Sequence, residues 1–198
     1  MRVLKKIFFT ALIVLVADQF LKFWIKTNMV LGQEFQVFDW FIIHFTENNG
    51  MAFGIEFGGL TGKILLTLFR IIVVGLAIYY LRNMMSTSFR TGALISVGLI
   101  MGGAIGNIID SVFYGVIFND SYNNIASFLP EAGGYAPFLQ GKVVDMFYFP
   151  LINTHFPNWL PFFGGENFIF FRPVFNIADA GISIGIILIL LFYQADFR

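Results

Sequence analysis

The sequence predicts an all-α membrane protein with four transmembrane helices, a small outward-facing β-containing subdomain and long outer loops. Composition is the first observation, because 58% of the 198 residues are hydrophobic, only 12% are charged, and the mean hydropathy is +0.78. Soluble domains carry about 25% charged residues, so this chain falls outside that class. The second observation is a set of four apolar stretches that approach the roughly 20 residues needed to cross a bilayer. We expect residues 1–198 to form one domain.

The apolar runs place the spans at about residues 7–25, 64–81, 93–112 and 174–192. Outer segments of about residues 26–63 and 113–173 connect the first span to the second and the third to the fourth. The first run also has the form of a cleavable signal peptide, because Arg2, Lys5 and Lys6 precede it. We favour an uncleaved span, since cleavage would discard Asp18 and Lys22, which lie one helical turn apart and can pair.

Basic residues near the ends of the spans predict the orientation, because they collect on the cytoplasmic side. The N-terminus carries three of them, the short loop between the second and third spans is bracketed by Arg82 and Arg90, and Arg198 ends the chain. The two long connections hold few bases and most of the acids. We therefore expect both termini in the cytoplasm and both long segments outside.

The outer segments and the third span carry further local signals. Residues 34–45 (EFQVFDWFIIHF) are rich in β-branched and aromatic side chains, which favours short strands at the membrane surface. Two glycine pairs, Gly133-Gly134 and Gly164-Gly165, and the single prolines Pro137, Pro157 and Pro161 mark turns in the 113–173 connection. The third span contains small residues that would let neighbouring helices approach closely: Gly92, Gly98, Gly102, Gly103 and Gly106.

Several classes of function are excluded by the residues that are missing. The chain has no cysteine, so it has no disulfide, no thiolate nucleophile and no cysteine-ligated metal. Its two histidines, His44 and His155, are isolated, and no His-Glu-x-x-His helix supports a zinc site. No basic run follows the N-terminus, so we expect no nucleic-acid partner. No cofactor or metal is expected.

Four aspartates lie inside or beside the predicted spans, at Asp18, Asp110, Asp145 and Asp179. A carboxylate at membrane depth costs about 2.5–3.5 kcal/mol, so it is retained where it is paired, wetted or functional. Two of them follow an asparagine by three residues, in Asn107-Ile108-Ile109-Asp110 and Asn176-Ile177-Ala178-Asp179. That spacing predicts an amide and an acid on one helical face. We place Asp179 about two turns into the last span, about 9 Å deeper than the helix-starting Pro173.

Three of these aspartates also have a structural explanation. Asp18 and Lys22 would form either a neutralised pair at the membrane interface or part of a site. Asp110 would be a hydrogen-bonded helix end, and Asp145, between apolar residues, a simple turn. The functional alternative is acid–base chemistry: two close carboxyl groups cannot easily both ionise. The ionised one would deprotonate a water and the protonated one would hydrogen-bond a scissile carbonyl.

Five motifs occur in order along the chain: D-Q-x-x-K at 18–22, N-x-G-x-A-F at 48–53, G-x-x-x-N-x-x-D ending at 110, V-V-D at 143–145 and F-N-x-A-D at 175–179. Together they resemble the five sequence boxes of the bacterial lipoprotein signal peptidases, the type II signal peptidase family. The resemblance implies an aspartyl endopeptidase of the bacterial cytoplasmic membrane. Such enzymes remove signal peptides from diacylglyceryl-modified prolipoproteins, cutting just before the lipidated cysteine.

The resemblance also assigns roles to residues. It implies that Asp145 and Asp179 are the catalytic dyad. The positions that match the supporting residues of the family are Asp18, Lys22, Asn48, Gly50, Asn107, Asp110 and Asn176. We expect prolipoprotein substrates and membrane lipids as partners, a monomeric enzyme, and an active site towards the outer, periplasmic face.

Two features depart from the family pattern. The third box usually continues with arginine, whereas Asp110 precedes Ser111 here. Residues 113–142 and 150–172 are also longer than the family leads one to expect. The alternative function is a proton-coupled transporter or channel with Asp110 and Asp179 as a relay. Transporters commonly show internal repeats and broken helices, and the sequence shows neither.

Overall fold

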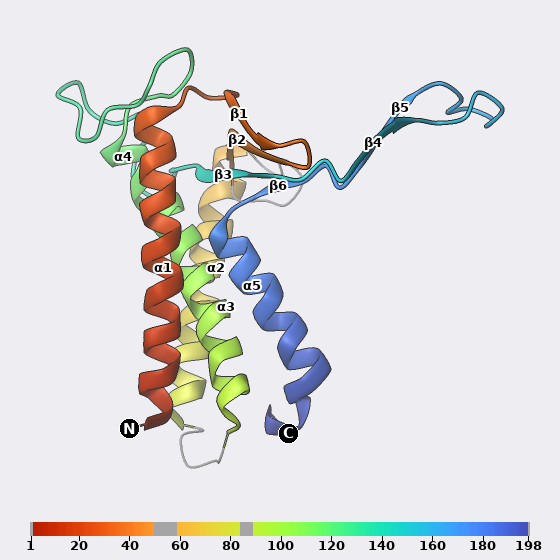
Figure 1. The fold of residues 1–198 in the computed structure, drawn as a ribbon. Helices are drawn as coiled ribbons and strands as arrows, with labels where there is room; N and C mark the ends of the chain where they lie inside the picture. The colour runs from red at the N-terminus through yellow and green to blue at the C-terminus, as the bar shows by residue number, and fades with distance from the viewer. Residues whose placement is uncertain (1, 50–58, 84–88, 198) are drawn as a thin grey trace.

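A computed structural model describes residues 2–49, 59–83 and 89–197. Within these residues, four helices are long and apolar enough to cross a membrane, as expected. They are α1 (Arg2–Asn28), α2 (Gly59–Asn83), α3 (Thr91–Ile109) and α5 (Ile177–Leu188) (Figure 1). A π-helical turn η2 (Asp110–Tyr114) and α4 (Gly115–Ile117) continue α3, whereas η3 (Ile189–Tyr193) and the 3₁₀ turn η4 (Gln194–Phe197) continue α5. Both chain ends lie at the same end of the bundle.

The start of the fourth helix differs from the sequence prediction. Helix α5 begins at Ile177, and the two residues at Val174–Phe175 form a strand instead. The reason is Asn176, which has extended backbone angles and accepts the backbone N–H of Asp179 with its side chain at 2.8 Å. Asparagine is a preferred residue at this capping position. Asp179 therefore lies in the first helical turn, and its predicted depth of two turns below Pro173 is wrong.

The opposite end of the bundle carries a four-stranded antiparallel sheet in the order β1-β2-β3-β6. Its strands are β1 (Glu34–Phe38), β2 (Phe41–Asn48), β3 (Val143–Tyr148) and β6 (Val174–Phe175). The strands expected within 34–45 are confirmed. The interpretation of Asp145 as a turn is wrong, because it lies in central strand β3 opposite Thr46. Two further strands, β4 (Ile152–His155) and β5 (Asn167–Phe170), pair with each other in a separate hairpin.

Helix α3 packs between α1 and α5, and its glycines allow this close packing. A Cβ atom on Gly102 would lie 2.6 Å from the carbonyl oxygen of Ala11 in α1. One on Gly103 would lie 2.3 Å from the carbonyl oxygen of Ala178 in α5. These distances confirm the predicted role of the small residues, because no larger side chain fits between the backbones. The contacts bring the C-terminal end of α3 against both neighbouring helices.

A buried ion pair attaches the long 113–142 segment to the sheet. Lys26, at the end of α1, lies 2.6 Å from Oε1 of Glu47 on β2, and both side chains are buried. The same ammonium donates to the hydroxyl of Ser121 at 2.8 Å. Lys142 reaches the second oxygen of Glu47 at 3.5 Å. Ser121 within the long segment and Lys142 at its end are therefore held near Glu47 of β2, next to the strand that carries Asp145.

Candidate active site

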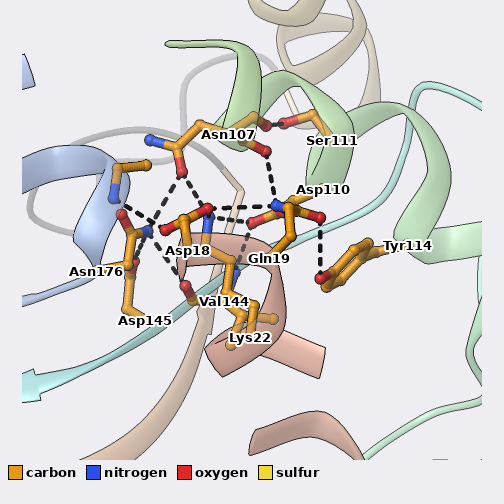
Figure 2. Close-up of polar contacts among 12 residues, drawn as sticks. Asp18, Gln19, Lys22, Asn107, Asp110, Ser111, Tyr114, Val144, Asp145 and Asn176 are labelled. Carbon is orange, nitrogen blue, oxygen red and sulfur yellow. Dashed lines mark hydrogen bonds and ion pairs between the residues drawn. The ribbon is translucent and has the colours of Figure 1, made fainter. Parts of the chain in front are cut away.

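The predicted site residues within the described ranges meet where α1, α3, β3 and the first turn of α5 converge (Figure 2). Hydrogen bonds and ion pairs link them into one network, namely Asp18, Lys22, Asn48, Asn107, Asp110, Asp145, Asn176 and Asp179. Gly50, also expected here, lies outside the described residues. The aspartates that are far apart in the sequence therefore belong to one site.

Lys22 is the centre of this network. Its ammonium lies 2.8 Å from Asp18 Oδ2 and 2.6 Å from Asp110 Oδ2, and all three side chains are fully buried. It also donates to Oδ1 of Asn107 at 2.9 Å. An ammonium has three protons to donate, and the site supplies three acceptors. The alternative of a pair at the membrane interface is wrong for Asp18 and Lys22, which cross-link α1 to α3 inside the protein.

Gln19 and Tyr114 complete the network and were not singled out in the sequence. The Gln19 amide donates to Asp110 Oδ1 at 2.8 Å and to the carbonyl of Gly106 at 3.2 Å. The Tyr114 hydroxyl lies 3.3 Å from Gln19 Oε1. The D-Q-x-x-K motif contained a signal for Gln19, because this glutamine adjoins an aspartate in an apolar span. Asp110 is thus held by α1 through two different side chains.

Asp18 also holds the beginning of α5. Its Oδ1 accepts the backbone N–H of Ala178 at 2.9 Å, while Oδ2 faces Lys22. The first N–H groups of a helix have no partner within the helix, and a carboxylate there is stabilised by the helix dipole. Asp18 therefore joins α1 to the helix that carries Asp179.

Asn107 and Asn176 connect this support to the two remaining carboxyl groups. Asn107 donates to Asp179 Oδ1 at 2.8 Å, and Asn176 donates to Asp145 Oδ1 at 2.6 Å. The two amides also meet, with Asn176 Nδ2 3.3 Å from Asn107 Oδ1. The predicted sharing of one helical face holds for Asn107 and Asp110, which both contact Lys22. It is wrong for Asn176, which caps the helix rather than lying within it.

Asp145 is in an environment that favours its protonated form. The side chain is buried on β3, and burial together with the negative charge of Asp179 raises its pKa to about 8. Lys22 and the amides of Asn48 and Asn176, which donate to the two carboxyl oxygens, act in the opposite direction. Burial dominates because removing a carboxylate from water is costlier than these contacts can offset. Asp145 therefore holds a proton at neutral pH.

Asp179 is in a contrasting environment. It is only partly buried and lies in the first turn of α5, where the helix dipole stabilises negative charge. Arg70 of α2 interacts electrostatically with the carboxylates of this site, most strongly with Asp179. Two carboxyl groups, one buried and one partly accessible, thus share Asn176 as a common neighbour. This arrangement can supply an acid and a base to one bound molecule.

Ser111 occupies the position of the family arginine. It is buried, and its hydroxyl donates to the backbone carbonyl of Asn107 at 2.8 Å. Asp110 instead pairs with Lys22 and Gln19 from α1. Its complete burial against Lys22 does not suit the alternative function as a proton relay. Among residues 2–49, 59–83 and 89–197, no group of three His, Cys, Asp or Glu side chains is placed to hold a metal ion.

Comparisons with known proteins identify the family and the fold of the chain. The family model described as signal peptidase II matches residues 10–194. A lipoprotein signal peptidase of Porphyromonas gingivalis is 56% identical over 182 residues, covering 91% of this chain and 79% of that protein. One of Amoebophilus asiaticus is 38% identical, covering 98% of this chain and 79% of the other. A bacterial membrane enzyme solved by the in meso method at 2.3 Å resolution has a TM-score of 0.59 and 25% identity, covering 96% of this chain and 88% of that one.

The network predicts that Lys22→Met lowers the free energy of unfolding by about 3–5 kcal/mol, because it leaves buried carboxylates without their cation. Adding Asp110→Asn to Lys22→Met should recover part of this loss by removing one uncompensated charge. Lys5→Met, at an exposed position on the same helix, is the control. Denaturant unfolding in detergent, followed by tryptophan fluorescence, measures all three. Equal stability of Lys22→Met and Lys5→Met would contradict the central role of Lys22.

Proposed function

We propose that this chain, which belongs to the signal peptidase II family, hydrolyses its substrate with Asp145 and Asp179 as the catalytic dyad. Membership makes the chain an aspartic-type membrane hydrolase that cleaves the signal peptides of lipoproteins. The observation that supports this assignment is the contrast between the environments of the two carboxyl groups. Asp145 is buried with a raised pKa, whereas Asp179 is partly accessible at a helix N-terminus.

The roles of the dyad follow from these environments. Asp179 takes a proton from the attacking water while Asp145 donates its proton to the scissile carbonyl, and a gem-diol forms. Asp179 then protonates the leaving nitrogen as the carbon–nitrogen bond breaks, and Asp145 regains a proton from a gem-diol hydroxyl. The second step restores the starting protonation of both groups, so the cycle needs neither a metal nor a covalent intermediate.

The supporting residues keep the two carboxyl groups in this relationship. Asn176 binds Asp145 with its amide and caps the helix turn of Asp179 with its carbonyl oxygen. Asn107 donates to Asp179, and Asn48 donates to the other oxygen of Asp145. Because these contacts hold the two carboxyl groups in place, a bound substrate meets them in the correct orientation. The buried cluster of Asp18, Lys22 and Asp110 supports the dyad indirectly, because it holds the helices in place.

The class of substrate follows from membership of the family. We infer that they are diacylglyceryl-modified prolipoproteins, cut just before the lipidated cysteine, because the described residues of the five family motifs include members of each motif that meet at one site. The site lies at the end of the bundle opposite both termini (Figure 1). Basic residues collect at the end of the bundle that holds both termini. Together with the position of the site, they support an inner-membrane protein with cytoplasmic termini and an outward-facing site. Membrane lipids surround the bundle, and one chain carries all the residues of the mechanism, which supports a monomer.

Substituting the dyad tests the assignment. Asp145→Asn and Asp179→Asn should each lower the turnover number by about 10²–10⁴-fold, because an amide cannot exchange the proton. The double variant should be little worse than either single one, because the pair acts as a unit. Asp110→Asn should be milder, since an amide preserves its shape and part of its hydrogen bonding. Initial rates on a lipidated precursor measure these effects.

The matched control for this series is Asp39→Asn, an exposed aspartate in the turn between β1 and β2, which should keep normal turnover. Near-normal turnover in Asp179→Asn would remove that residue from the mechanism. Equal and complete loss in the Asp110, Asp145 and Asp179 variants, with folding intact, would assign Asp110 a catalytic role as well.

The cleavage rate should follow a bell-shaped dependence on pH. Asp145 must be protonated to act as the acid, so the rate falls as pH rises through its pKa of about 8. The rate also falls in acid, because the carboxylate that activates the attacking water is then lost. EDTA should not change the profile, because no step requires a Lewis acid. A rate abolished by EDTA and restored by zinc would contradict the mechanism, as would a rate that rises continuously above pH 8.

Reporter fusions test the orientation. A reporter that is active only in the cytoplasm should be active when fused after Arg82 and inactive when inserted within residues 120–135. A periplasmic reporter should give the opposite pattern at both positions. Cytoplasmic activity at both positions would contradict the proposed topology.

A further inference from the structure

The hairpin of β4 and β5 projects from the sheet as an arm, which we define as residues 150–172. Strand β3, which carries Asp145, leads into the arm, and strand β6 and α5, which carries Asp179, follow it. At its base, β3 pairs with β6 through Phe147 with Phe175 and Tyr148 with Val174. The arm is therefore the connection between the two proposed catalytic residues, closed at its base by a short antiparallel ladder.

The tip of the arm is apolar and exposed. Residues 156–165 (FPNWLPFFGG) contain no charged side chain. Phe162 is 95% exposed and Trp159 is 78% exposed, although both are large apolar side chains. Further exposed apolar residues along the arm are Leu151, Ile152, Phe163, Phe170 and Phe171. Soluble surfaces rarely expose so continuous an apolar patch, whereas tryptophan and other aromatic residues gather where a membrane meets water.

The length of the last apolar helical stretch places the base of the arm where the membrane meets water. The apolar helical stretch Ile177–Phe197 has 21 residues. At 1.5 Å per residue it rises about 30 Å, which equals the thickness of the hydrocarbon core. Its first residue therefore lies at the edge of the core, and β6, which ends two residues earlier, lies just beyond it. Figure 1 shows the arm extending sideways from its base, more across the helix axes than along them, and sloping away from the bundle toward its tip.

The aromatic surface of the arm is continuous with that of the sheet. Trp40, in the turn between β1 and β2, stacks with Phe149 at 6.1 Å between ring centroids. Phe149 stacks with Phe175 at 5.7 Å, and Phe175 contacts Phe171 of the arm at 6.1 Å. Trp40 is itself exposed. A row of rings thus runs from the sheet to the base of the arm.

We propose that the arm lies in the interfacial region of the bilayer leaflet next to the active site and binds lipid through Trp159, Phe162 and Phe163. The occupant of this surface is the lipid bilayer itself, because the level, the sideways direction and the uncharged aromatic tip all match the interface. The inference rests on the four helices crossing a bilayer and not on the peptidase assignment.

Single-tryptophan variants test lipid contact directly, because the chain has three tryptophans. Trp24→Phe with Trp40→Phe leaves Trp159 as the only reporter. Trp40→Phe with Trp159→Phe leaves Trp24, an exposed residue of helix α1, as the matched positive control. Both proteins are reconstituted into phosphatidylcholine and phosphatidylglycerol vesicles whose acyl chains carry bromine, a contact quencher. Unchanged unfolding midpoints establish that the variants are folded.

Trp159 should lose most of its emission in brominated vesicles, as Trp24 does, and should resist quenching by aqueous acrylamide. Adding Phe162→Ser and Phe163→Ser should reduce the lipid quenching of Trp159 and leave a parallel Trp24 reporter unchanged. Strong acrylamide quenching without bromine quenching would place the tip in water and overturn the proposal. Protection from both quenchers would also overturn it, because a protein partner or a second copy would then cover the tip.

Discussion

The buried Lys22 is the interaction on which the arrangement of this site depends. A charged ammonium inside a protein is tolerated only when its protons are accepted, and Lys22 has acceptors on Asp18, Asp110 and Asn107. These contacts fix α1 against α3, and Asp18 extends the same cluster to the first turn of α5. The glycines of α3 make this possible by allowing the three helices to approach closely. The close packing of the helices and the pairing of the buried charges thus depend on the same arrangement of α1, α3 and α5.

That support holds two aspartates of identical chemistry in different environments, on which the roles that we propose for them rest. Asp145 comes from a strand and is buried, and burial raises the pKa of its carboxyl group to about 8. Asp179 comes from a helix N-terminus and is partly accessible. Asn176 contacts both, and it links the carboxyl group on the sheet to the first turn of the helix. The sheet is needed for this difference, because a bundle alone would offer both carboxylates from similar helical positions.

The composition and apolar runs of the sequence predicted the four spans, and the resemblance of its five motifs to a known family predicted the residues that meet at the site. It did not predict β3, since Val143–Tyr148 is short and its partner β2 lies about a hundred residues away. It misplaced Asp179, because the sequence does not show that strand β6 ends at Phe175 and that Asn176 caps α5 instead of lying within it. Gln19 and Tyr114 were missed because their partners on other elements are visible only in three dimensions.

We propose that Asp145 carries the proton of the resting dyad. Infrared spectroscopy of the protein in a bilayer tests this directly, because a protonated carboxyl group has a carbonyl stretching band that a carboxylate lacks. We expect a band at neutral pH that disappears as pH rises through about 8, is absent in Asp145→Asn and persists in Asp179→Asn. A band that is missing from the unmodified protein at neutral pH, or that disappears only in Asp179→Asn, would contradict it.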